Sequence, residues 1–144
     1  MSYPHILIAI DDSAPSVIAL KQALKLAQDL NSKVTLVEVM QLDPITAEEY
    51  VKTGQSNEYI ERARNYILES LATIKAEYAS TLEISTQLLE GFSVADAINQ
   101  AAQELHVDLI VMGSHGRTGI KKIVLGSVAQ KVLNESSIPV LIVK

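Results

Sequence analysis

Short apolar runs alternate along the chain with longer segments in which apolar residues recur every three or four positions. A short, nearly continuous apolar run rich in β-branched residues is typical of a strand buried on both faces. Recurrence every three or four positions is typical of a helix with one buried face. The predicted strands are 5–10, 33–40, 82–89, 107–112 and 138–143, of which 82–89 alternates and has one more polar face. The predicted helices are 13–30, 60–78, 94–105 and 127–134.

The first predicted helix has recognisable ends, whereas the segment after the second strand has no period. Asp12 or Ser13 can cap the first turn, and Pro15 is tolerated there. The apolar face of this helix is expected to consist of Val17, Leu20, Leu24 and Ala27. Residues 41–57 are polar and include proline and glycine, so they are predicted to form a surface loop.

Strands and helices alternate throughout, which predicts a parallel sheet covered by helices on both faces. The length of 144 residues fits a single domain, and no boundary is apparent within 1–144. We therefore expect one doubly wound α/β domain with a five-stranded sheet. Ligands of such sheets bind beyond the carboxyl ends of the strands, where the strand order reverses.

Composition excludes several classes of function. The chain has no cysteine, so disulfides, thiolate metal sites and a cysteine nucleophile are excluded. A net charge of −5 argues against nucleic-acid binding. The first residues contain neither a basic segment nor an apolar run long enough for a signal peptide or a membrane span. No membrane association is expected, and the cytoplasm is the predicted location.

Two segments that follow predicted strands carry candidate chemistry. Asp11 and Asp12 follow the first strand, and a glycine-rich segment with Gly113, Gly116 and Gly119 follows the fourth. From 109 to 134 there are 26 residues without Asp or Glu, where the chain average predicts about three. Glycines let the backbone approach a ligand closely, and the N–H groups at a helix start bind anions. The locally basic segment therefore suits a polyphosphate, although a solvated loop of chance composition would look similar.

The glycine spacing distinguishes among phosphate motifs. The pattern is neither G-x-x-x-x-G-K-[ST] nor G-x-G-x-x-G, which disfavours a P-loop and a dinucleotide site. Gly113-x2-Gly116-x9-Gly126-Ser127 instead resembles the nucleotide-binding branch of the universal stress protein family, whose pattern is G-x2-G-x9-G-[S/T]. The resemblance covers essentially the whole chain and implies the strand order 3-2-1-4-5.

The resemblance also implies roles for individual residues. Asp11 is expected beside the ribose and phosphates. If a metal ion accompanies the phosphates, the carboxylate of Asp11 is the side chain expected to contact it. The main chains of Val39 and Met112 are expected to contact adenine, with Ala9 and Ile10 lining the pocket. The ribose and phosphates are expected to be held by Gly113, Gly116, Gly126, Ser127 and Val128. His115, Arg117, Lys121 and Lys122 either screen phosphate charge or are solvated loop residues.

These expectations lead to one hypothesis and two alternatives. The hypothesis is a stress-related regulator that binds ATP, or ADP or AMP, together with Mg²⁺ carried mainly on the phosphate oxygens. The alternatives are a slow ATPase or adenylate-transferring enzyme, and a dimeric interaction module without a ligand. The last strand is apolar at every position, so an exposed edge there would need a partner. A homodimer is therefore expected to form through Val140, Leu141, Ile142 and Val143.

Overall fold

The computed structural model describes residues 3–11, 13–45, 48, 52, 58–114 and 125–144. In chain order, its helices and strands are β1 (His5–Ile10), α1 (Ala14–Leu30), β2 (Lys33–Gln41), α3 (Glu58–Tyr78), β3 (Ile84–Gly91), α4 (Val94–Glu104), β4 (Leu109–Gly113), α5 (Ser127–Glu135) and β5 (Val140–Val143).

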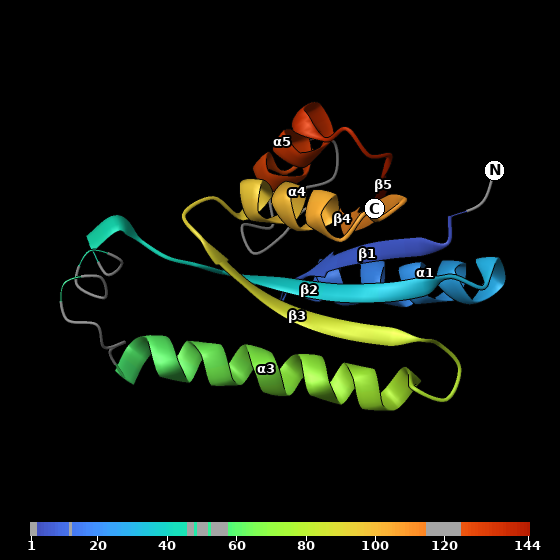
Figure 1. The fold of residues 1–144 in the computed structure, drawn as a ribbon, viewed down its shortest axis with the longest axis horizontal. Coiled ribbons are helices and arrows are strands. Elements are labelled where there is room, and N and C mark those ends of the chain that lie inside the picture. The colour runs from blue at the N-terminus through green and yellow to red at the C-terminus, as the bar shows by residue number, and fades with distance from the viewer. Residues whose placement is uncertain (1–2, 12, 46–47, 49–51, 53–57, 115–124) are drawn as a thin grey trace.

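The five strands form one parallel sheet in the order β3-β2-β1-β4-β5, as predicted. Helices α1 and α3 cover one face, and α4 and α5 cover the other (Figure 1). The chain moves outward in one direction from β1 and in the other from β4, so the order reverses between these two neighbours. The carboxyl ends of β1 and β4 therefore lie side by side, where a ligand is expected.

Residues of the central strands alternate between two apolar cores because successive strand side chains point to opposite faces. Ile6 and Ile8 of β1 pack on the side of α1 and α3, whereas Leu7 packs on the side of α4 and α5. All three are at most 1% exposed. This burial on both faces explains why the strand sequence is a continuous apolar run.

Three strands, β3, β4 and β5, begin two residues later than predicted. For β3 and β4 the reason is that the preceding helices continue into hydrogen-bonded turns. The N–H of Leu82 donates to the carbonyl of Tyr78, which keeps it in the turn that ends α3. The N–H of Val107 likewise donates to the carbonyl of Ala102, and His106 has a left-handed φ of 52°. Apolar character marked the buried residues correctly in both places, but it did not distinguish a turn from a strand.

Two further expectations need correction. Val17, expected on the buried face of α1, is 47% exposed, while the other three expected residues are buried. The loop predicted at 41–57 lies largely outside the described residues. Within it, Pro44, Ile45, Glu48 and Lys52 have helical backbone, so the loop prediction is wrong for them.

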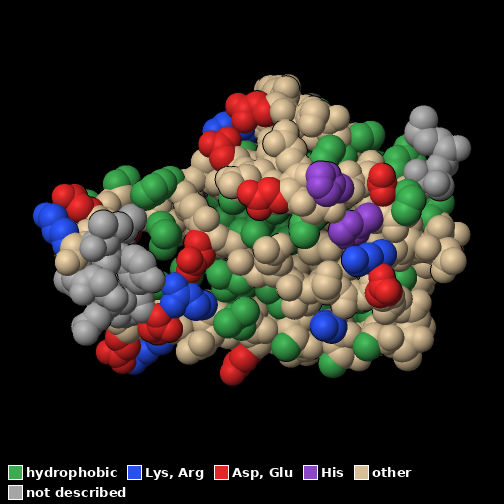
Figure 2. Space-filling view, viewed as in Figure 1, with side chains coloured by type: hydrophobic (Ala, Val, Ile, Leu, Met, Phe, Trp, Pro, Cys, Tyr) green, Lys and Arg blue, Asp and Glu red, His purple; other side chains and the backbone are tan. Residues whose placement is uncertain are grey.

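The amino ends of the strands carry a polar cluster on the side of α4 and α5. His5 Nε2 lies 2.7 Å from Thr35 Oγ1, which lies 3.1 Å from Ser85 Oγ on the next strand. The backbone N–H of His5 donates to Asp108 Oδ2 at 2.9 Å. Histidine side chains reach the surface beside lysine and carboxylate groups (Figure 2). The cluster ties three strands together at the end of the sheet opposite the expected ligand site.

Candidate functional site

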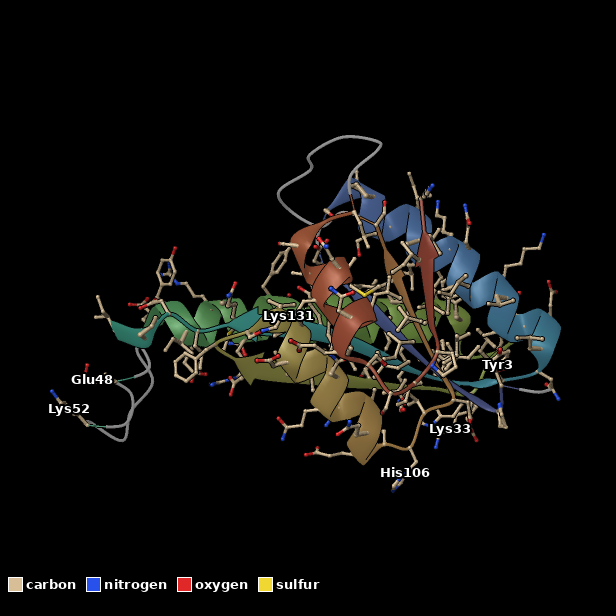
Figure 3. The ribbon with its side chains drawn as sticks, turned by 90° about the horizontal axis from the view of Figure 1, so that it is seen from above. Tyr3, Lys33, Glu48, Lys52, His106 and Lys131 are labelled. Carbon is tan, nitrogen blue, oxygen red and sulfur yellow. The ribbon has the colours of Figure 1, made fainter. Side chains whose placement is uncertain are left out.

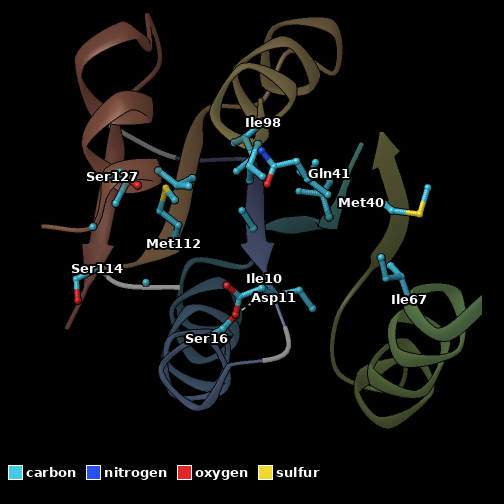
Figure 4. A pocket seen from close by; sticks show the side chains of 18 of the residues that line it. Ile10, Asp11, Ser16, Met40, Gln41, Ile67, Ile98, Met112, Ser114 and Ser127 are labelled. Carbon is cyan, nitrogen blue, oxygen red and sulfur yellow. Dashed lines mark hydrogen bonds between the residues drawn. The ribbon is translucent and has the colours of Figure 1, made fainter. Parts of the chain in front are cut away.

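A cavity of about 330 Å³ opens at the carboxyl ends of β1, β2 and β4 (Figure 4). It reaches both faces of the sheet, since its walls include residues from α1 and α3 as well as α4 and α5. The described lining residues are Ala9, Ile10, Asp11, Ser16, Val37, Val39, Met40, Gln41, Ala63, Ile67, Val94, Ile98, Met112, Gly113, Ser114, Gly126, Ser127, Val128 and Ala129.

The end of β1 is shaped by hydrogen bonds around Asp11. Asp11 Oδ1 accepts hydrogen bonds from the backbone N–H of Ser13, at 2.8 Å, and from its hydroxyl. The N–H of Asp11 donates to the buried Ser16 Oγ at 2.8 Å. Ser13 in turn caps α1, because its Oγ accepts from the N–H of Ser16. Asp11 therefore holds a turn, and the same residue forms part of the cavity wall.

The start of α5 differs from the starts of α1 and α4. Serine side chains, Ser13 and Ser93, cap α1 and α4, whereas α5 has Gly126 at its N-cap and donates no capping hydrogen bond to any side chain that the structure describes. The N–H of Gly126 donates to the carbonyl of Ser114 at 2.7 Å, which fixes the helix start over the end of β4. The first turn of α5 contributes Ser127 and Val128 to the cavity. An uncapped helix start facing a cavity is suited to an anion.

The end of β2 supplies the opposite wall. Val37, Val39 and Gln41 point to the same face of the sheet, because they alternate along the strand. The side-chain amide of Gln41 donates from Nε2 to the carbonyl of Phe92 at 2.8 Å. Ile98 of α4 faces this wall (Figure 4). The cavity thus changes from polar at the start of α5 to largely apolar at β2.

Nine of the ten residues predicted to hold a nucleotide line this cavity. They are Ala9, Ile10, Asp11, Val39, Met112, Gly113, Gly126, Ser127 and Val128. The tenth, Gly116, lies outside the described residues, as do Asp12, His115, Arg117, Lys121 and Lys122. Their predicted proximity to phosphate stays a prediction.

Several other wall residues were not among the predicted site residues. Ser16 lies in the first turn of α1, and Ala63 and Ile67 lie within α3. They reach the cavity only because α1 and α3 pack against the carboxyl end of the sheet. Gln41 directly follows the predicted strand 33–40, and Ser114 lies in the glycine-rich segment after the fourth predicted strand. The rule that sites lie beyond strand ends could therefore have marked both residues. Val94 and Ile98, which lie in the predicted helix 94–105, also form part of the wall.

Lys131 is the one lysine or arginine of the acid-free segment that the structure describes. Its Nζ lies 3.2 Å from Asp96 Oδ1 and 3.3 Å from Ser93 Oγ. From α5 it points toward the start of α4 (Figure 3). Lys131 thus links the middle of α5 to the start of α4, and it is not one of the lining residues.

The described residues contain no group of three or more His, Asp or Glu side chains placed to hold a metal ion. Asp11 is the one ionisable side chain among the described lining residues. A divalent cation in this cavity would therefore depend chiefly on oxygens of the bound ligand, as Mg²⁺ does when it accompanies phosphates.

The fold and cavity define a doubly wound α/β protein with a cavity at the switch point of its sheet. The model of the universal stress protein family matches residues 2–144, and the chain belongs to this family. A relative is the universal stress protein MJ0531 of Methanocaldococcus jannaschii, which is 32% identical over 143 residues, or 99% of this chain and 82% of the relative.

Solved structures show the same fold. The hypothetical protein MJ0577, whose structure was used to assign its biochemical function, superposes with a TM-score of 0.81 at 30% identity, over 100% of this chain and 97% of that one. A universal stress protein in complex with cAMP gives 0.65 at 23% identity, over 99% and 98% of the two chains. One from Archaeoglobus fulgidus in complex with dAMP gives 0.66 at 24% identity, over 100% of both.

Among the described residues, no helix combines the length and the apolar character needed to cross a membrane. The predicted cytoplasmic location stays a prediction.

Proposed function

We propose that this protein binds an adenine nucleotide, ATP with Mg²⁺, in the cavity at the carboxyl ends of β1, β2 and β4. The observation that carries the proposal is the start of α5, which lacks a side-chain cap and lines a cavity that becomes apolar toward β2. Such a cavity suits a molecule with an anionic end and a flat apolar end. The structures of family members with dAMP and cAMP support adenine as the base.

The phosphates bind at the start of α5 in this proposal. Backbone N–H groups in the first helical turn have no partner within the helix, and the helix dipole places partial positive charge there. The hydroxyl of Ser127 adds a donor, and the backbone at Gly113 and Gly126 forms the adjoining wall. The loop containing Gly116, His115, Arg117, Lys121 and Lys122 extends this site in the proposal.

The ribose and base then lie toward β1 and β2. Asp11, at the end of β1, is placed to accept a hydrogen bond from a ribose hydroxyl or to contact the Mg²⁺ carried by the phosphates. Adenine occupies the apolar part of the cavity near Val39 and Met112, with Ala9 and Ile10 beside it. Burial of the ring against aliphatic side chains stabilises the complex through the hydrophobic effect.

We propose binding rather than rapid turnover. Hydrolysis needs a group that positions or activates water, and Asp11 is the one carboxylate among the described lining residues. Oδ1 of that carboxylate already accepts two hydrogen bonds from Ser13. The nucleotide is then a regulatory ligand whose presence changes the surface around residues 113–126 that a protein partner contacts. ADP production that is lost in Asp11→Ala would instead favour the enzyme.

Isothermal titration of the protein with ATP and Mg²⁺ tests the proposal. We expect saturable heat at tens of micromolar protein, and mass spectrometry should detect an adenine nucleotide in protein purified without added ligand. Absence of heat at these concentrations, together with no co-purified nucleotide, would favour an interaction module without a ligand.

Gly126→Asp separates nucleotide binding from folding. Gly126 has φ −61° and ψ 155°, a backbone conformation open to any residue, and aspartate is a strong N-cap. The variant should therefore keep or raise its melting temperature while it loses ATP binding, since the carboxylate occupies the phosphate position and repels it. Gly126→Asn is the matched control, because it can cap the helix without a charge and should weaken binding less. Unchanged ATP affinity in Gly126→Asp would contradict a phosphate site at α5.

We also propose that the protein is a homodimer formed through β5. This strand lies at the edge of the sheet and pairs with β4 alone among the described strands. Its four residues are apolar, and Leu141 is 40% exposed. Antiparallel pairing with β5 of a second copy would satisfy the open edge and cover these side chains.

A further inference from the structure

The base end of the cavity has apolar walls, yet it carries one amide side chain. Gln41 is the last residue of β2, two positions beyond Val39 on the same face of the sheet. Its carboxamide lies across the cavity mouth toward Ile98 of α4 (Figure 4). The phosphates are proposed to bind at the start of α5, which follows β4 in the chain. In the sheet, β1 lies between β2 and β4. Gln41 is therefore at the end of the cavity farthest from the phosphate position.

A hydrogen bond orients the carboxamide of Gln41 so that Oε1 faces away from Phe92. Gln41 Nε2 donates to the carbonyl oxygen of Phe92 at 2.8 Å. A carbonyl oxygen can only accept, so the NH₂ group must be the side of the amide that faces Phe92. The opposite side, Oε1, is an acceptor with two lone pairs.

We propose that Gln41 recognises the base, with Oε1 accepting a hydrogen bond from the exocyclic amino group of a 6-aminopurine. This inference rests on the proposed nucleotide site and adds a selectivity to it. A 6-oxopurine such as hypoxanthine or guanine presents an oxygen at the same position, and two acceptors would then face each other. Rotating the amide to present NH₂ would place Oε1 against the carbonyl of Phe92 and break that hydrogen bond. Gln41 is exposed in the free protein, and a bound base displaces the water around its carboxamide. Either arrangement then leaves a polar group unpaired, which is how a site rejects a close analogue.

The test compares ATP with ITP. ITP carries an oxygen at position 6 of the ring where ATP carries an amino group, and its neighbouring N1 bears a proton. Dissociation constants for both are measured by isothermal titration in the presence of Mg²⁺. We expect the unmodified protein to bind ATP at least about tenfold more tightly than ITP. In Gln41→Leu, which has a similar size and no acceptor, the ratio should fall below about threefold.

Gln87→Leu is the matched control. Gln87 is also a strand glutamine, lies on β3, is exposed and does not line the cavity. It should keep the ATP preference of the unmodified protein. Because each ratio is measured within one variant, partial loss of folded protein affects both ligands equally and does not change the result.

The outcomes separate this inference from the proposed function. Tight binding of ATP and ITP with equal affinity would overturn the role of Gln41 and leave the nucleotide site intact. A preference for ATP that persists in Gln41→Leu would also overturn it, since another group would then recognise the base. Failure of the unmodified protein to bind either nucleotide would overturn the proposed function and this inference together.

Discussion

Single side chains at the ends of the sheet perform more than one task. Asp11 was expected beside the ribose and phosphates, and the structure shows that it also holds a turn. Its Oδ1 holds the turn through Ser13, while the residue lines the cavity. Local hydrogen bonding of this kind favours aspartate just before a helix. A substitution at Asp11 is therefore expected to affect both the start of α1 and the ligand.

His5, at the opposite end of the sheet, predicts a dependence of stability on pH. Burial, followed by the charge of Lys33, lowers the pKa of His5 below its ordinary value, against weaker opposing effects of Asp108 and Glu83. The folded state thus favours the neutral ring. Its contribution to stability is complete above about pH 6.5, the ordinary value in the unfolded chain, and is lost as the pH falls below it.

Thermal unfolding between pH 7.5 and 5.5 measures this effect. The melting temperature should fall toward pH 5.5, and the fall should be smaller in His5→Gln, which has no titrating ring. Lys33→Gln, which removes the second cause of the shift, should reduce the fall in part. The same pH slope in His5→Gln as in the unmodified protein would show that His5 does not contribute.

At the scale of elements, the helix starts decide where a ligand can bind. Helices α1, α4 and α5 all begin at the carboxyl edge of the sheet, as parallel topology requires. Serine caps close the first turns of α1 and α4, whereas glycine leaves that of α5 open to the cavity. The sequence contained this difference, as Ser13, Ser93 and Gly126. The tertiary structure was needed to show that all three helix starts lie on one edge of the sheet and that the start of α5 is the one that opens to the cavity.

Helix α4 contains a polar side chain whose burial predicts a stabilising substitution. Both polar atoms of the Asn99 side chain are buried and have no hydrogen-bond partner among the residues that the structure describes. An unsatisfied buried amide destabilises the folded state, and alanine has a higher helix propensity than asparagine. Asn99→Ala should raise the free energy of unfolding by about 1 kcal/mol, measured by urea denaturation.

Ala97→Ser is a useful comparison on the same helix, since it adds a hydroxyl instead of removing an amide and lowers helix propensity. It should not stabilise the protein. A loss of stability in Asn99→Ala of more than about 1 kcal/mol would mean that the amide contributes to folding.

At the scale of the whole molecule, the two edges of the sheet differ. The edge at β3 contains both apolar and polar residues, and its carboxyl end is linked to α3, since Arg64 Nη2 lies 2.7 Å from Glu90 Oε1. This ion pair raises the pKa of Arg64, so the guanidinium stays charged. The edge at β5 is short and entirely apolar. An apolar edge invites pairing with another strand, whereas charged side chains discourage it.

Leu141→Lys should convert the proposed dimer to a monomer, because it places a charge on the β5 edge at a position that is 40% exposed within one chain. Multi-angle light scattering after size-exclusion chromatography measures the mass. Leu68→Lys on α3, which replaces a leucine that is 47% exposed, is the control and should leave the dimer intact. A monomeric unmodified protein, or a dimeric Leu141→Lys, would contradict pairing through β5.

The pattern of residues was sufficient for most of the fold. Continuous apolar runs identified β1 and β4, because strands buried on both faces have no polar side to alternate with. Boundaries such as those at Leu82 and Val107 were misplaced, since an apolar residue in a helix-ending turn looks like the first residue of a strand. The exposure of Val17 was also missed, because helical spacing does not show where the covering sheet ends.

The sequence by itself determined the alternation of strands and helices, the two segments that carry glycine and aspartate, and the apolar character of β5. These features depend on neighbouring residues, so local spacing and composition are enough to show them. Only the tertiary structure decided that residues from α1, α3 and α4 share one cavity with Asp11 and Gly126, and that the amide of Gln41 is oriented by the carbonyl of Phe92. Those contacts join positions far apart in the chain, and the packing of helices on the sheet is what brings them together.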